Sequence, residues 1–213
     1  MAEHAMAAID REPRWPAFAA MLAAGCVYWA LPEQLSVGPS WFLLAAIFVL
    51  LIPTVASHYR GYHNAARLLV LVANGLIMAA MIGSLGFLIQ GLPKHEEPPA
   101  VLLRSAVALW ITNVLVFALW YWKVDAGGPT MRDRMRGKLN SSFLFPQMMG
   151  PTRNPNWSPQ FMDYLFLAFN TSTAFSPTDT AVLSRWAKLA MMLQSLISLS
   201  IIAVLAARAV NIL

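Results

Sequence analysis

Long apolar runs separated by short polar segments organise the chain. Four of them cover residues 15–31, 39–56, 67–92 and 100–122, and a fifth begins at Thr180. A helix of about 20 apolar residues crosses the roughly 30 Å hydrocarbon core of a bilayer, because each residue adds about 1.5 Å. The pattern therefore predicts an all-α, polytopic transmembrane helix bundle with four N-terminal spans.

The first run is the shortest of the four, and it can gain length from residues 35–37. Its small residues, which include Ala20, Ala24 and Gly25, would let a neighbouring helix approach closely. We expect a single membrane domain with four parts. These are an N-terminal tail at 1–14, a four-helix part at 15–122, a basic polar loop at 123–157 and a helix-turn-helix at 158–213.

The last part places polar residues between two lipid-compatible segments. Ser158 and Pro159 predict a helix start before the apolar run 161–169, and a long apolar helix is expected from Thr180 onward. Irregular backbone inside a bilayer is tolerated only where protein or water satisfies it, so this turn is a candidate lining of an aqueous path. The candidates in the turn are Asn170, Thr171, Ser172, Thr173, Ser176, Thr178 and Asp179, and those on the last helix are Gln194, Ser195 and Ser198.

The helix before this turn is too short to cross a bilayer alone. Residues 161–175 would reach about 22 Å as a helix, against about 30 Å of hydrocarbon. We expect it to enter and leave on one side, or to span only where the bilayer is thinned.

This order of elements resembles the pore module of tetrameric cation channels, in which an outer helix, a pore helix, a filter loop and an inner helix follow one another. Segment 173–179 reads TAFSPTD and resembles the potassium-channel filter Thr-Val-Gly-Tyr-Gly-Asp, but it is one residue longer and has neither filter glycine. The resemblance implies an oligomeric pore for a small ion, without potassium selectivity, since stacked filter carbonyls need the backbone freedom of glycine.

The whole chain is also similar to a bacterial integral-membrane family with no established activity. The stretches that carry this likeness are WYW at 120–122, GGP at 127–129, FPQ at 145–147 and AARAVN at 206–211. This likeness implies a location in the cell inner membrane.

Composition agrees with a membrane protein. The chain is 58% hydrophobic and 12% charged, with a mean hydropathy of +0.56. Its net charge of +5 does not indicate nucleic-acid binding, because the basic residues lie in loops between apolar runs. The single cysteine, Cys26, excludes an intrachain disulfide, and the pair His58 and His63 lacks a carboxylate or thiol neighbour that would favour a metal site.

The distribution of basic residues predicts a cytoplasmic N-terminus. If the first four runs all span, one side carries ten lysines and arginines and the other carries two, Lys94 and Arg104. Basic residues in short loops resist translocation. The ten are Arg11, Arg14, Arg60, Arg67, Lys123, Arg132, Arg134, Arg136, Lys138 and Arg153. The long loop at 123–157 is then cytoplasmic too, on the side opposite to that of the resembled channels.

Several polar residues within the apolar runs have a structural and a functional interpretation. The positions of Asn74 and Asn113 indicate hydrogen bonds between helices rather than a substrate site. The position of Arg104 near a helix end indicates contact with lipid headgroups. Asp163 is expected in the first turn or two of the short helix, where it suits the helix dipole, and Asp179 or its threonine neighbours are expected to cap the last helix. The alternative role for these carboxylates is to attract cations at a pore mouth. Gln194, Ser195 and Ser198 either line a conduit or join helices, and the sequence does not separate these two roles.

Two functional hypotheses follow. The first is a channel-like protein that passes a small ion through a homo-oligomeric pore, and the second is a non-transport membrane scaffold or assembly partner. Catalysis is not expected, because the hydroxyl groups near residue 173 have no histidine or lysine at a useful spacing to activate them. No catalytic residue, metal site or cofactor is predicted, and the expected partners are the bilayer, further copies of the chain and a small ion.

Overall fold

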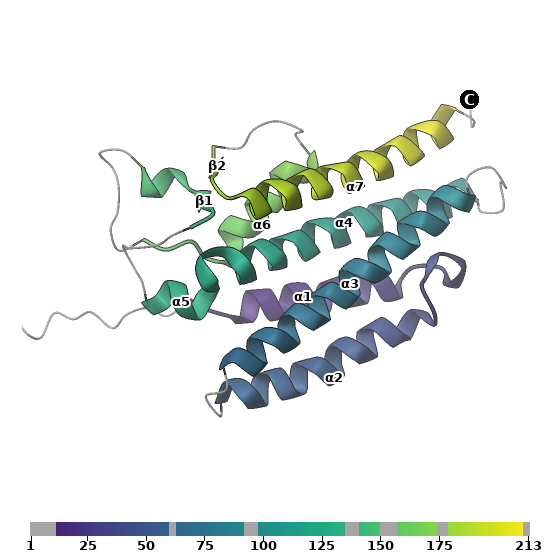
Figure 1. The fold of residues 1–213 in the computed structure, drawn as a ribbon. Helices are drawn as coiled ribbons and strands as arrows, with labels where there is room; N and C mark the ends of the chain where they lie inside the picture. Colours follow the sequence, from purple (N-terminus) through teal and green to yellow (C-terminus); the bar gives the residue numbers. More distant parts are fainter. Residues whose placement is uncertain are drawn as a thin grey trace, which may run out of the picture.

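The computed structural model describes residues 12–59, 63–91, 98–134, 141–149, 157–173 and 179–210. The described part of the chain is all-α, as predicted, apart from two strands of two residues each (Figure 1). The helices are α1 Trp15–Trp29, α2 Ser40–Tyr59, α3 His63–Gly91, α4 Pro99–Val124, α5 Pro129–Arg134, α6 Phe161–Thr173 and α7 Arg185–Val210, and the strands are β1 Phe143–Leu144 and β2 Ala181–Val182. Short 3-10 turns cover Glu33–Leu35, Asp125–Gly127 and Pro146–Met148.

Four helices in the described part of the chain are long and apolar enough to cross a membrane. They are α2, α3, α4 and α7. The first predicted run forms the shorter apolar helix α1, whose 15 residues extend about 22 Å. Membrane compatibility is therefore confirmed for three of the four N-terminal runs and for the last helix.

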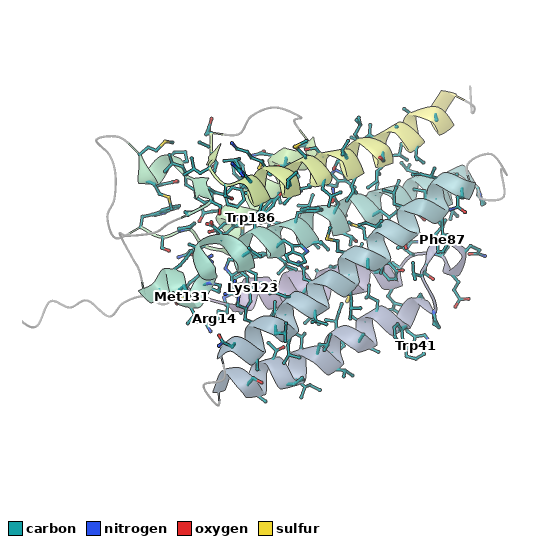
Figure 2. All side chains as sticks on the ribbon, viewed as in Figure 1. Arg14, Trp41, Phe87, Lys123, Met131 and Trp186 are labelled. Atoms are coloured by element: carbon teal, nitrogen blue, oxygen red, sulfur yellow. The ribbon has the colours of Figure 1, made fainter. Side chains whose placement is uncertain are left out.

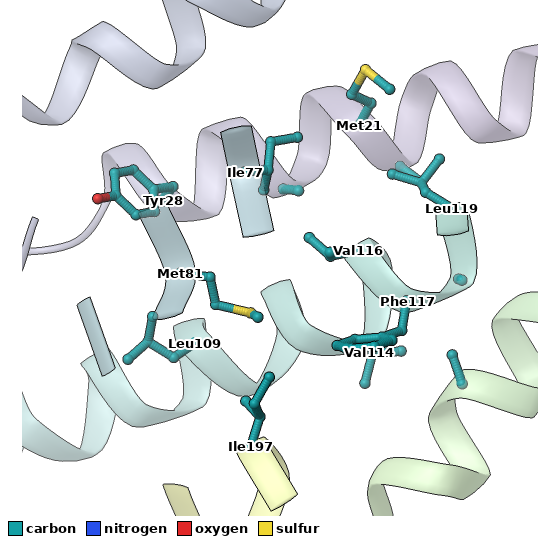
Figure 3. Packing of buried hydrophobic residues seen from close by; sticks show 14 of the residues in the cluster. Met21, Tyr28, Ile77, Met81, Leu109, Val114, Val116, Phe117, Leu119 and Ile197 are labelled. Carbon is teal, nitrogen blue, oxygen red and sulfur yellow. The ribbon is translucent and has the colours of Figure 1, made fainter. Parts of the chain in front are cut away.

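Helix α4 lies at the centre of the bundle. It packs against α1 and α3 on one side and against α6 and α7 on the other (Figure 1). Buried apolar side chains from four helices meet around it, among them Met21, Ile77, Leu109, Phe117 and Ile197 (Figure 3). The two halves of the chain therefore share one core.

Small residues let α1 and the segment after it pack closely on their neighbours. A Cβ on Gly25 would lie 2.8 Å from Ile47 Cδ1 in α2, and one on Gly83 would lie 2.5 Å from Val37 Cγ2. The Tyr28 hydroxyl accepts hydrogen bonds from the Val37 N–H at 2.7 Å and from the Ser84 hydroxyl at 3.1 Å. The chain from α1 to Val37 thus runs along α3 toward the C-terminal part of that helix.

The residues directly after α4 form a tight turn followed by a short helix. Ala126, Gly127 and Gly128 have φ values of 49°, 80° and 90°, which reverse the chain and lead it into α5. A Cβ on Gly128 would lie 2.8 Å from the Lys123 carbonyl oxygen, so a larger residue does not fit there. Between α4 and α6, Arg132 and Phe143 are fully buried.

The starts of the last two helices differ from the sequence prediction. The prediction that the last helix begins at Thr180 with Asp179 as its cap is wrong, because Ala181–Val182 forms β2, which pairs antiparallel with β1. Helix α7 begins at Arg185, and the Ser184 hydroxyl accepts the Ala187 N–H at 3.4 Å.

Helix α6 begins at Phe161, two residues later than Ser158 and Pro159 predict. Asp163 lies in its first turn, as expected, and its carboxylate accepts the Gln160 N–H at 2.7 Å. The carboxylate therefore satisfies a backbone donor at the helix start.

Candidate functional site

Helix α6 runs antiparallel to α4, along the C-terminal half of α4. Near the C-terminal end of α4, the Trp122 ring meets the Phe161 ring edge to face with centroids 6.0 Å apart. Near the middle of α4, Trp110 meets Phe169 in the same way at 5.7 Å. With 13 residues, α6 extends about 20 Å, and it ends beside the midpoint of α4.

After α6 the chain returns to the end of the bundle from which α6 starts. Leu183 donates its N–H to the Ser142 carbonyl at 2.8 Å, next to the β1–β2 pair. Phe143 of β1 contacts Tyr164 near the start of α6 and Trp186 near the start of α7. Helices α6 and α7 therefore begin at the same end and run parallel, with β1 tying the two starts together (Figure 1).

Gln194 of α7 is the centre of a buried polar cluster between α4, α6 and α7. Its side-chain amide donates to the Ala168 carbonyl and to the Ser172 hydroxyl, both at 2.7 Å. Its Oε1 accepts the Tyr121 hydroxyl at 2.6 Å. The side chain of Gln194 is fully buried, so it uses both ends of its amide to join three helices.

Asn113 of α4 completes this cluster. Its Nδ2 donates to the Ser198 hydroxyl at 3.0 Å, to the Gln194 carbonyl at 3.3 Å and to the Ser172 hydroxyl at 3.5 Å. Asn74 donates to the Val116 carbonyl at 3.2 Å, so the interhelical role predicted for both asparagines is confirmed. Within the described residues, the Oδ1 atoms of Asn74 and Asn113 have no hydrogen-bond partner.

The predicted turn residues divide into buried and exposed groups. Thr171 and Ser172 are buried, Asn170 is half-buried, and Thr173 and Asp179 are exposed. The hydroxyls of Thr171 and Thr173 donate to carbonyls one turn back, those of Leu167 and Phe169, at 2.8 and 2.9 Å. Ser176 and Thr178 lie outside the described residues.

The predicted lining residues of the last helix face the protein interior. Ser198 is fully buried, like Gln194, and half-buried Ser195 donates to the Thr171 carbonyl at 3.4 Å. The exposed face of α7 is instead apolar, and it carries Leu189, Met192, Leu196, Leu199 and Ile202. Between the two roles that the sequence leaves open, this geometry favours the joining of helices.

A second buried cluster, which sequence reasoning does not find, surrounds Arg132 of α5. Its guanidinium donates to the carbonyls of Trp122 and Asp125 at 2.7 and 3.0 Å and pairs with the Glu12 carboxylate at 3.0 Å. The Trp122 indole N–H also donates to Glu12. Arg132 further lies 5.0 Å from the Tyr164 ring centroid.

Asp125 extends this second cluster toward β1 and α6. Its carboxylate accepts the Tyr164 hydroxyl at 2.7 Å, the Ser141 hydroxyl at 2.6 Å and the Ser142 N–H at 2.5 Å. The cluster therefore holds the N-terminal segment, the end of α4, β1 and α6 together. A possible sequence signal is the WYW–GGP stretch followed by basic residues, but the partner Glu12 lies 120 positions away.

Burial affects the ionisation of Glu12. Desolvation raises the pKa of its carboxyl above the ordinary 4.5, and the nearby Arg132 guanidinium partly opposes that rise. Both buried charges are hydrogen-bonded, which is what allows them to remain away from water. Through these contacts the N-terminal segment is joined to the end of α4 and to α5.

No protein-family model, curated protein or solved structure matches this chain. In the part of the chain that the structure describes, no group of three metal-ligating side chains comes together. The two families named from the sequence stay predictions.

Proposed function

We propose that this protein is a channel-like integral membrane protein, and that a small ion passes through an oligomer of it by way of the segment that follows α6. The observation that carries the proposal is the course of α6. This helix starts at the end where α4 finishes, ends near the midpoint of α4, and is followed by a return to its starting end at β2.

A helix that enters a bilayer and returns on the same side leaves irregular backbone at membrane depth. Such backbone is tolerated where it lines a water-filled space or is enclosed by protein. The polar cluster around Gln194 also supports this proposal, although it does not line the conduit. It fixes the C-terminal half of α6 to α4 and α7 and so holds the end of α6 in position. In this proposal Gln194 and Ser198 are positioning residues, and the conduit is lined by exposed groups such as Thr173 and Asp179.

The second candidate function is a non-transport scaffold or assembly partner. The observation that favours it is the apolar character of the exposed face of α7, which includes Leu196 and Leu199. Such a face can contact lipid or pack against another membrane protein. In this case the turn after α6 only joins two helices.

Ion flux from liposomes that contain the purified full-length protein distinguishes the two functions. The channel-like function predicts flux above that of empty liposomes under an ion gradient. Asp179→Ala removes an exposed carboxylate near the proposed entrance, and we expect cation flux to fall about tenfold, because charge at a pore mouth raises the local ion concentration.

Glu33→Ala is the matched control, since it removes an exposed carboxylate from the turn between α1 and α2. We expect this variant to conduct like the unmodified protein. Absence of flux under every gradient tested, from protein that elutes as a single folded species, would contradict ion passage and favour the scaffold.

A further inference from the structure

A pocket lies where α1, the start of α3, the end of α4 and α5 meet. It has a volume of about 150 Å³, and it borders the Arg132 cluster at Trp122 but includes no residue of the cluster around Gln194. Arg14, Lys123 and Met131 lie together at this end of the bundle (Figure 2), and all three line the pocket. The pocket thus sits at the end of the bundle that carries the predicted cytoplasmic segments.

The walls of the pocket combine cations with apolar side chains. Arg14, Arg67 and Lys123 line it, and no carboxylate does so among the described residues. The apolar lining includes Met21 and Leu119, both almost completely buried. A space of this volume accommodates an apolar group about the size of a benzene ring.

The three cations differ in their existing interactions. Arg14 donates to the Thr130 hydroxyl at 3.2 Å and lies 4.0 Å from Asp133. Arg67 and Lys123 take part in neither of the two ion pairs found among the described residues. Since all three cations line the same pocket, an anion placed between them would relieve unfavourable charge.

We propose that this pocket binds an anionic phospholipid, with the headgroup phosphate between Arg67 and Lys123 and the start of an acyl chain against the apolar wall. The proposal is independent of ion passage, since it uses a different face of the bundle. Charge complementarity selects an anionic headgroup, and the apolar wall selects an amphiphile over free phosphate. The pocket lies at a helix end, where basic residues meet the headgroups of a bilayer.

Thermal stabilisation of the purified protein in detergent tests this assignment. Phosphatidylglycerol and phosphatidylcholine with the same acyl chains are titrated separately, and the apparent affinity of each is read from the rise in melting temperature. We expect phosphatidylglycerol to bind with higher affinity. Arg67→Gln combined with Lys123→Gln should weaken its binding about tenfold or more, as each cation near an anionic headgroup contributes several-fold to affinity.

Arg185→Gln combined with Lys188→Gln is the matched control, because it removes one arginine and one lysine from exposed positions at the start of α7. The control should bind phosphatidylglycerol like the unmodified protein. Equal weakening by both double variants, or equal affinity for the two lipids, would overturn the proposal.

Two soluble probes separate the sources of the anion. Inorganic phosphate and glycerophosphoglycerol carry the anionic group without acyl chains, and neither should stabilise the protein at concentrations where phosphatidylglycerol saturates it. Stabilisation by either one to the same extent would show a phosphate site rather than a lipid site. Circular dichroism of each variant verifies that loss of binding is not loss of the fold.

Discussion

Arg132 and Glu12 place opposite charges where neither is hydrated. The exposed fraction of the Arg132 side chain is 0%, and that of Glu12 is 4%. Loss of one member of a buried ion pair costs about 3 to 5 kcal/mol, because the other charge remains uncompensated. The two residues respond differently to the loss of their partner. A carboxylate left alone can take up a proton within the ordinary pH range, whereas a guanidinium left alone cannot release one.

This difference predicts a pH-dependent cost for Arg132→Met. Without the guanidinium, the pKa of Glu12 in the folded protein rises further above its ordinary 4.5. The folded state then binds a proton that the unfolded state has released, so the free energy of unfolding falls as pH rises through that window. We expect the melting temperature of Arg132→Met in detergent to lie closer to that of the unmodified protein at pH 5 than at pH 8.

Two further variants control this experiment. Glu12→Gln leaves the guanidinium charged at both pH values, so its loss of melting temperature should be about the same at each. Arg185→Met makes the same substitution at an exposed position and should change little. A pH-independent loss in Arg132→Met would show that packing rather than charge governs the cost.

At the scale of elements, α6 depends on α7 for its position. Gln194→Leu removes one hydrogen-bond partner each from the Tyr121 hydroxyl, the Ala168 carbonyl and the Ser172 hydroxyl. We expect a cost of about 1 to 3 kcal/mol, from interhelical hydrogen bonds lost inside a membrane protein. The effect should be local, so backbone amides of α6 should exchange with deuterium faster while those of α2 do not change.

Gln90→Leu is the matched substitution for this comparison, because Gln90 is exposed on α3. It should leave exchange in α6 unaltered. Faster exchange across all helices in Gln194→Leu would instead mean that the cluster supports the whole bundle.

The sequence predicts these elements better than it predicts their contacts. The runs that become α2, α3, α4 and α7 are visible because each is continuously apolar. The sequence pattern does not distinguish β2 from the last helix, since Ala181 and Val182 continue the apolar run. The inward orientation of Gln194 could not be predicted either, because it depends on which helix lies opposite, and the burial of Arg132 depends on a residue in the predicted tail.

At the scale of the whole molecule, three basic residues from distant parts of the chain gather at one end of the bundle. Arg14, Arg67 and Lys123 come from three segments that the charge pattern places on one side, and they line a single pocket. Helix α7 starts at this same end and, with 26 residues, extends about 39 Å. The three segments therefore lie at the same end of the bundle, which is the arrangement that the charge argument for the orientation assumes.

The predicted orientation can be measured with reporter fusions. A fusion after Gly128 should report the cytoplasm, and one after Ala207 should report the opposite side, because α7 leads away from the basic end. Periplasmic alkaline phosphatase activity after Gly128 would reverse the orientation, while a cytoplasmic reading after Ala207 would mean that α7 does not cross.

The parallel course of α6 and α7 also has an electrostatic consequence. The aligned peptide dipoles of a helix place about half a negative charge at its C-terminal end. In α6 that end lies beside the midpoint of α4, away from both ends of the bundle. The proposed conduit would pass this end, where a negative partial charge attracts positive ions and repels negative ones. Any ion that passes along the segment after α6 is therefore expected to be a cation.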